Sequence, residues 1–297
     1  MVNPIATSPA IDLSGLPPPQ VIDQPDYEAR LAAKLASLIA AAPAFSALVE
    51  SDPAMKLLEA DSYDETVLAQ AFAEAARGML LAFATGPRLD HLAALFGVER
   101  MVITPATGTS PAVLESDAAL RQRLQLAPHA FSVAGPELAY AFHARSAHPD
   151  VADATAISPS PGEVVVTVLS ASGTGVPAPG VIDAVRAVLE GPVRPLTDHV
   201  TVGPAALVPF AVEAELTVFA GPDQALVLQT AQDSLATHLA AARRLGRDVT
   251  RSALIAALHV GNVQNVNLIQ PVADVVISPQ EVGLASSVSV IVAGTVL

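Results

Sequence analysis

The sequence contains no cysteine and no tryptophan, and aromatic residues make up only 4% of its 297 residues. The absence of cysteine excludes disulfides, iron–sulfur clusters, thiolate zinc sites and thiol nucleophiles. Charged residues are also scarce, at 15%, and 29 acidic against 15 basic side chains give a net charge of -14. This balance argues against a nucleic-acid-binding surface, which needs clustered lysine and arginine to face phosphates.

Hydrophobic residues are abundant, at 52% of the chain, and the mean hydropathy is +0.48. Such a chain is not intrinsically disordered, and its length suggests about two domains. Because few charged side chains are available to cover the surface, we expect partner subunits to cover part of it. The first residues lack the basic and apolar regions of a signal peptide. The long uncharged run 164–182 is broken by glycine and proline, so we expect a soluble, non-secreted protein that does not insert into membranes.

The first hundred residues have helical periodicity. Residues 1–24 form an extended arm that contains three consecutive prolines, and a helix begins near Pro25. An apolar stripe at helical spacing follows, comprising Tyr27, Leu31, Leu35, Leu38, Ile39 and Ala42. Ser62 and Glu65 have the spacing of a capping box, which predicts a second helix from there to about residue 86. That helix would place Leu68, Phe72, Ala75, Met79 and Phe83 on one face.

Beyond residue 98 the pattern changes from helices to mixed helices and strands. A loop over 98–111 precedes the segments with the clearest periodicity. Helices are expected at 88–96, 117–126, 136–147, 179–189, 223–242 and 250–260, and strands at 151–157, 164–169, 200–202, 208–219, 263–269, 274–277 and 287–292. The sequence therefore predicts an α+β fold with a helical N-terminal region. The expected divisions are an extended N-terminal arm (1–24), a helical region (25–130), a central α+β domain (131–205) and a C-terminal α+β domain (206–297).

Candidate catalytic groups are few. His143 and His148 are five residues apart rather than four, so one helix face does not present both. Asp150 and Asp153 lie nearby, and a metal site or a hydrolase that uses His143 with either carboxylate stays an alternative to structural roles. The pair Gly173 and Gly175 lacks the further glycine and lysine of a phosphate loop, which favours a hairpin or crossover loop.

The basic residues form two small groups. Arg243, Arg244, Arg247 and Arg251 cluster near a helix end without interleaved aromatics, which favours helix capping or an acidic partner surface over nucleic acid. Arg121 and Arg123 lie on a predicted helix and indicate a solvated or interface face. No G-x-S-x-G elbow is present. We therefore expect no enzymatic activity and no cofactor.

Several segments, taken in order, resemble the baseplate J-like proteins of contractile-tailed phages. They are ATGPRLDHLAALFGVER at 84–100, ESDAALRQRLQLAPHAFSVAGPELAYAFHARSA at 115–147, VADATAISPSPGEVVVTVLS at 151–170, VRPLTDHVTV at 193–202, and RRLGRDVTRSALIAALHVGNVQNVNLIQPVADVVIS at 243–278. The start of the chain, IDLSGLPPPQVID with DYEARLA, also matches. The loop TPATGTSPAV after Arg100 is shorter than the Pro-rich loop usual in the family.

The resemblance implies a structural role without an active site. Such proteins are expected to form wedges of the tail baseplate, in a six-fold ring around a central hub and spike. Two copies are expected per wedge, joined to other wedge proteins through the helical region, while the C-terminal α+β domains join neighbouring wedges. Hub and sheath-initiating proteins are further expected partners, and the ring would relay its dilation to sheath contraction. The expected location is the virion tail baseplate, or a headless phage-like bacteriocin, after assembly in the host cytoplasm.

The candidate inter-subunit surface is the helix face of Leu31, Leu35 and Leu38, which we expect to join an inter-chain helical bundle. The alternative is that these leucines pack only within their own chain. A different class of function, a receptor-binding or other tail-tip interaction module, would show exposed aromatic sites or fibre repeats. The chain has three tyrosines and no tryptophan, so this alternative ranks second.

Overall fold

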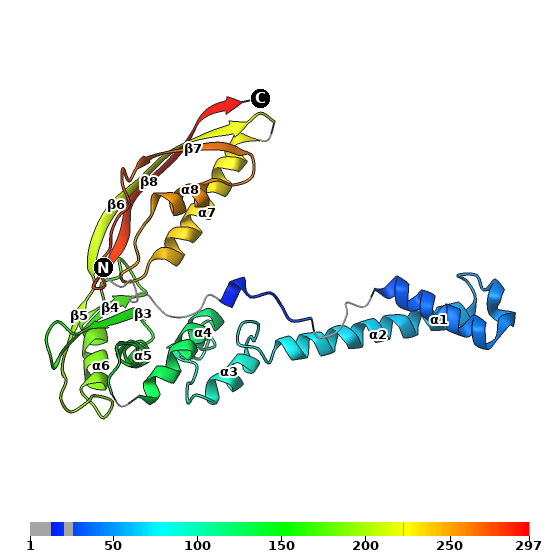
Figure 1. Cartoon of the computed structure of the whole chain (residues 1–297), viewed down its shortest axis with the longest axis horizontal. Helices are drawn as coiled ribbons and strands as arrows, with labels where there is room; N and C mark the ends of the chain where they lie inside the picture. The colour runs from blue at the N-terminus through cyan, green and yellow to red at the C-terminus, as the bar shows by residue number, and fades with distance from the viewer. Residues whose placement is uncertain (1–12, 21–25, 133, 222, 297) are drawn as a thin grey trace. The chain divides into compact units, whose positions relative to one another are not determined.

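A computed structural model describes residues 13–20, 26–132, 134–221 and 223–296 (Figure 1). The chain divides between Glu99 and Arg100 into two compact units, a helical unit and an α+β unit. The predicted α+β fold class with a helical N-terminal region is confirmed. Most of the expected N-terminal arm lies outside the described residues. The four-part division of the chain stays a prediction.

The helical unit contains three α-helices and two short 3-10 segments within the described residues. Their bounds are Leu13–Gly15 (η1), Tyr27–Ala41 (α1), Pro43–Ala47 (η2), Pro53–Arg77 (α2) and Pro87–Ala94 (α3). The carboxylate of Asp26 caps α1 by accepting a hydrogen bond from the Glu28 backbone N–H at 3.1 Å. Helix α2 begins with Pro53 at its first turn, where the missing N–H costs no helical hydrogen bond.

The capping box expected at Ser62 and Glu65 is wrong, because both residues lie in the middle of α2. Ser62 is buried there, and its hydroxyl has no hydrogen-bond partner among the described residues. A capping box needs an extended backbone at its serine, whereas the chain is already helical from Pro53 onward. Helix α2 also ends at Arg77, earlier than the periodicity predicted.

Helices α1 and α2 form an antiparallel hairpin held by exposed ion pairs. Lys34 Nζ lies 2.6 Å from Asp61 and 3.3 Å from Glu65, and Arg30 lies 2.9 Å from Glu65. Arg30 pairs with Glu65, whereas Lys34, one turn later on α1, pairs with Asp61, one turn earlier on α2. The two helices are therefore antiparallel. No residue of α1 is fully buried. Exposed ion pairs contribute little to stability. Because α1 also buries no residue completely, the hairpin has only a small core of its own.

The α+β unit begins with a small β-ribbon and two helices. Its first elements are Val102–Thr104 (β1), Val113–Leu114 (β2), Asp117–Leu126 (α4), Ala127–Phe131 (η3) and Glu137–Ala147 (α5). The predicted loop over 98–111 therefore contains β1, which pairs antiparallel with β2. The hydroxyl of Ser116 caps α4 by accepting from the Ala119 N–H.

The first sheet has the order β3-β4-β5. Strands β3 (Val151–Ile157) and β4 (Glu163–Ser170) are antiparallel, and the helix α6 (Pro179–Leu189) connects β4 to the parallel strand β5 (His199–Pro204). Side chains of α5 and α6 pack on one face in a core that includes Tyr140, Ala144, Val166, Val185 and Leu189. Valine and alanine fill most of this core, as expected from a chain poor in aromatics.

The second sheet has the order β7-β6-β8, with β6 antiparallel to β7 and parallel to β8. Its elements are Ala206–Phe219 (β6), Gln224–Ala242 (α7), Arg251–Leu258 (α8), Val263–Gln270 (β7) and Glu281–Val296 (β8). Helices α7 and α8 lie against one face of the sheet (Figure 1), and Leu216, Leu235 and Leu254 are fully buried between these layers. The strand predicted at 274–277 is wrong: Val275 makes only an isolated bridge to Val249.

Three hydrogen bonds link the parts of the α+β unit that are built on the two sheets. The Asp153 carboxylate accepts from the Leu245 N–H at 3.1 Å, and the Thr155 hydroxyl donates to the Pro279 carbonyl at 2.7 Å. Arg243 donates to the Gly173 carbonyl at 2.9 Å. A small apolar cluster also brings together Leu169, Ala205, Leu245 and Val282 from the two parts. Strand β4 is therefore buried on both faces, which explains its continuous run of apolar residues.

Candidate interaction surfaces

The sequence-predicted helix face of Leu31, Leu35 and Leu38 lies on α1, and all three side chains are half-buried. Lys34 shares this face at helical spacing and pairs with carboxylates of α2. The face is thus turned partly toward α2 of the same chain, while part of each leucine stays accessible. Its contact with another chain stays a prediction.

Helix α2 exposes more apolar surface than α1 does. Leu57, Leu68 and Phe72 are 72%, 57% and 59% exposed, although Leu68 and Phe72 belong to the face that the periodicity predicts. Tyr63 and Val67 are exposed on another side of the same helix. Single exposed apolar residues are ordinary, but several exposed apolar side chains on one helix make α2 a candidate surface for contact with another protein.

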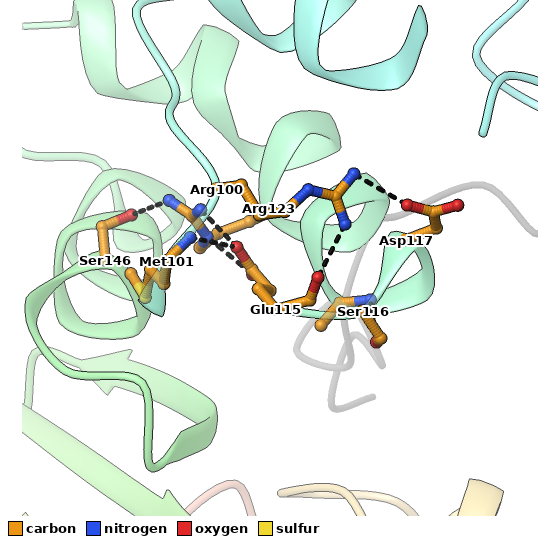
Figure 2. A network of polar contacts seen from close by, with 8 residues as sticks. Arg100, Met101, Glu115, Ser116, Asp117, Arg123 and Ser146 are labelled. Carbon is orange, nitrogen blue, oxygen red and sulfur yellow. Dashed lines mark hydrogen bonds and ion pairs between the residues drawn. The ribbon is translucent and has the colours of Figure 1, made fainter. Parts of the chain in front are cut away.

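A polar network with a buried ion pair joins the residues just before β1 and just after β2 to α4 and α5 (Figure 2). Arg123 donates two hydrogen bonds to the Glu115 carboxylate, at 3.0 and 2.7 Å, and both side chains are less than a tenth exposed. Arg100 donates to the Glu115 carbonyl at 2.6 Å and to Asp117 at 2.7 Å, while Arg123 also reaches Ser146. A bidentate pair in this setting fixes geometry more than it adds stability.

The expectation of a solvated or interface role is therefore wrong for Arg123, which lies inside the fold. The sequence carried one usable signal, the carboxylate of Glu115 just before the N-cap of a helix that also carries Arg123. Two residues eight positions apart on a loop and a helix have no fixed spacing rule, so only the fold shows that they meet.

The histidine and aspartate group around residue 150 makes internal contacts. The His148 ring accepts a hydrogen bond from the Asp150 N–H at 3.1 Å, and Asp150 accepts one from the Ser170 hydroxyl at 2.5 Å. His143 packs edge-on against Phe142, with ring centroids 5.4 Å apart, and burial lowers its pKa. Burial raises the pKa of Asp153, whose carboxylate joins the two sheets. These contacts fit the structural interpretation of all four residues.

The glycine pair and the arginine cluster noted in the sequence also make contacts or turns that serve the fold. Gly173 and Gly175 lie in the crossover between β4 and α6, both at positive φ, as a tight loop requires. Arg243 and Arg247 follow α7, where Arg247 donates to the Ala241 carbonyl at 3.3 Å. Arg251 donates to the carbonyls of Leu268 and Pro271. Arg247 thus bonds a carbonyl in the last turn of α7, and Arg251 bonds one carbonyl of β7 and one just after it.

Within the described part of the chain, no three histidine or acidic side chains gather as metal ligands would. In the same residues, no helix combines the length and apolar character needed to cross a bilayer.

Polar groups committed to internal contacts, together with a helical hairpin that leaves apolar surface uncovered, are typical of a subunit built for assembly. The comparisons with known proteins agree with this class. Residues 50–107 match the baseplate J-like N-terminal domain, and residues 132–204 match the baseplate J-like central domain. The chain is 40% identical to "Baseplate protein J" of Escherichia phage P2 over 299 residues, which cover 97% of this chain and 99% of that protein. The chain belongs to the baseplate J-like family.

Proposed function

We propose that the chain is a structural subunit of the baseplate of a contractile tail, in a phage or a phage-like bacteriocin. The observation that carries the proposal is the 40% identity to a baseplate protein along nearly the whole of both chains. Identity that spans both units means that the helical hairpin and both sheets are shared, and not one module alone. The internal contacts of the histidine and aspartate groups support a role without catalysis.

The proposed assembly is a wedge that contains two copies of this chain and other wedge proteins. Six wedges surround the hub and spike, and the ring relays its rearrangement through sheath-initiating proteins to sheath contraction. The uncovered apolar residues of α2 and the half-buried face of α1 support a helical bundle with other chains. The subunit assembles in the host cytoplasm and is then found in the virion tail baseplate.

Immunogold labelling of purified tails tests the location. Antibodies raised against the purified chain are expected to label only the baseplate end of extended tails. Deletion of the gene is expected to yield tail preparations without baseplates. Label along the sheath, or intact baseplates from the deletion strain, would contradict the proposal.

The substitution Leu35→Asp tests the helix face of Leu31, Leu35 and Leu38. A carboxylate placed in a bundle seam loses its hydration without gaining a partner, so co-purification with other wedge proteins should fall at least about tenfold, which is roughly 1.4 kcal/mol. The matched control is Ala36→Asp, which adds the same charge at an exposed position of α1. Circular dichroism must show an unchanged helical content. Unchanged co-purification for a folded Leu35→Asp variant would mean that the face packs only within its own chain.

A further inference from the structure

Strand β8 is the longest strand in the described part of the chain, and it lies at the edge of its sheet. Its sixteen residues, Glu281–Val296, pair in parallel with β6 along their whole length. The sheet order β7-β6-β8 places no described strand on its other side. A strand edge without a neighbour presents backbone N–H and C=O groups that can pair with another chain.

The composition of β8 does not protect this edge. After Glu281 the strand contains no charged residue and no proline, the two side-chain devices that natural sheets use against edge pairing. Two bulges interrupt its register, at Ser286 and Ala293, although the Ser286 hydroxyl still donates to the Phe210 carbonyl of β6 at 3.0 Å. Between them the segment SVSVIV at 287–292 is regular, and such short uncharged segments rich in valine and isoleucine pair readily with other strands.

Among the described residues, few groups cover the edge. The Gly246 N–H donates to the Glu281 carbonyl at 3.0 Å and so occupies the first residue of β8. The Gln232 side chain reaches the Val290 carbonyl at 3.5 Å, which is long for a hydrogen bond. Val288 and Ile291 are 49% and 52% exposed. The regular segment of β8 is therefore accessible to a second strand.

We propose that β8 pairs with β8 of a second copy of this chain, antiparallel and around a two-fold axis. Pairing of one strand with itself satisfies the requirement of a two-fold interface that the same patch serves on both sides. Two copies of a chain with a net charge of -14 repel one another most where carboxylates meet, and β8 after Glu281 brings no carboxylate to the contact.

The other sheet edges fit a second copy less well. Strand β7 is half as long, β5 ends in Pro204, and β3 carries Asp153. Pairing through β8 joins the two three-stranded sheets into one continuous six-stranded sheet, in the order β7-β6-β8-β8-β6-β7. The inference rests on the proposed function, because it names the strand through which copies meet in the baseplate.

Sedimentation of the full-length chain tests the pairing. The test variant is Ile291→Lys on β8, and the matched control is Ile269→Lys on β7, the opposite edge of the same sheet. Both add one positive charge at a partly exposed isoleucine. The wild type and the control are expected to dimerise with rising concentration, and Ile291→Lys is expected to raise the dimer dissociation constant at least about tenfold. A monomeric wild type at about 100 μM, or equal association of the two variants, would overturn the inference.

Cysteine cross-linking provides a second readout if the lysine variant does not fold. Because the natural chain has no cysteine, Ser289→Cys can form a disulfide only with the same residue of another copy. Mild oxidation is expected to cross-link Ser289→Cys and not the control Asn267→Cys on β7. Equal cross-linking of the two variants, or none from Ser289→Cys, would argue against pairing through β8.

Incorporation into tails separates this inference from the proposed function. If Ile291→Lys enters baseplates and their rings close as in the wild type, the β8 contact is wrong although the baseplate role holds. If the wild-type chain is absent from baseplates, the proposed function is wrong whatever β8 does in solution.

Discussion

The helical unit and the α+β unit differ in how much apolar surface they bury. In the described part of the helical unit the buried apolar side chains are Ala69, Ala84, Leu89, Ala93 and Val98. The α+β unit instead has two separate cores under its sheets and a third cluster where the sheets meet. Burial of apolar surface is the main source of folding free energy. We therefore expect the α+β unit to hold its own fold and the helical hairpin to gain order when other chains contact it.

The ion pairs of the two units also differ in their burial. In the helical unit, Lys34 and Asp61 pair at the surface, and the contact with the Asp61 side chain raises the pKa of Lys34. In the α+β unit, Glu115 and Arg123 pair out of solvent. Water and salt screen the first pair, but the second must stay intact because each partner is buried.

The largest expected effect comes from breaking the buried pair. The substitution Glu115→Gln removes the carboxylate charge that faces the buried Arg123 guanidinium, so the free energy of unfolding should fall by about 3–5 kcal/mol. Asp61→Asn in the helical unit is the comparison and should leave the main unfolding transition unchanged. Urea denaturation followed by circular dichroism measures both. Equal effects of the two substitutions would remove the distinction between the two kinds of ion pair.

A smaller effect is expected from removing apolar side chains. Leu216→Ala creates a cavity under the second sheet, where Leu216 is fully buried, and should destabilise the α+β unit by about 2–5 kcal/mol. Leu57→Ala removes an exposed leucine of α2 and should change stability by no more than about 0.5 kcal/mol in the free chain. Calorimetry of the two variants gives the comparison. A large loss from Leu57→Ala would show that the helical unit has a core that its burial pattern does not indicate.

The smallest expected effect is a pH dependence at the junction of the two sheets. Burial raises the pKa of Asp153 above its unfolded value, against the opposing influence of Arg145. The folded state therefore binds this proton more tightly than the unfolded state does. The contribution of Asp153 to stability is greatest below the unfolded pKa, near 3.9, and declines as pH rises toward the raised folded pKa.

Denaturation of the wild type and Asp153→Asn across this range measures that contribution. The stability of the wild type relative to the variant should increase as pH falls, because the variant cannot take up the proton. A difference that stays constant with pH would mean that the Asp153 carboxyl has the same pKa in both states.

Much of the α+β unit could be predicted from its sequence. A run of β-branched residues predicted β4 to within one residue at each end, and the Thr250 cap predicted the start of α8, where its hydroxyl accepts from the Ala253 N–H. Local spacing was less informative in the helical unit. The Ser62 and Glu65 spacing suggested a helix start inside a helix that begins at Pro53, because spacing alone does not specify the backbone conformation that a cap requires.

Contacts between distant segments could not be predicted in either unit. The pairing of Glu115 with Arg123, and that of Asp153 with the Leu245 N–H, depend on how elements pack and not on any sequence spacing. The absence of a catalytic arrangement was expected from the motifs, and the internal partners of His148 and Asp150 are compatible with it. The inter-chain role of Leu31, Leu35 and Leu38 stays a prediction, since a single chain does not contain the surface that would cover them.

Hydrogen exchange of the free chain and of the chain in assembled baseplates tests the difference between the two units most directly. In the free chain, amides of α1 and α2 should exchange at least about 100-fold faster than those of β4 and β6, since a helical pair with few buried contacts opens at low cost. Assembly should slow exchange in α1 and α2 and leave β4 and β6 unchanged. Equal protection of the helices and the strands in the free chain, with no change on assembly, would contradict the account.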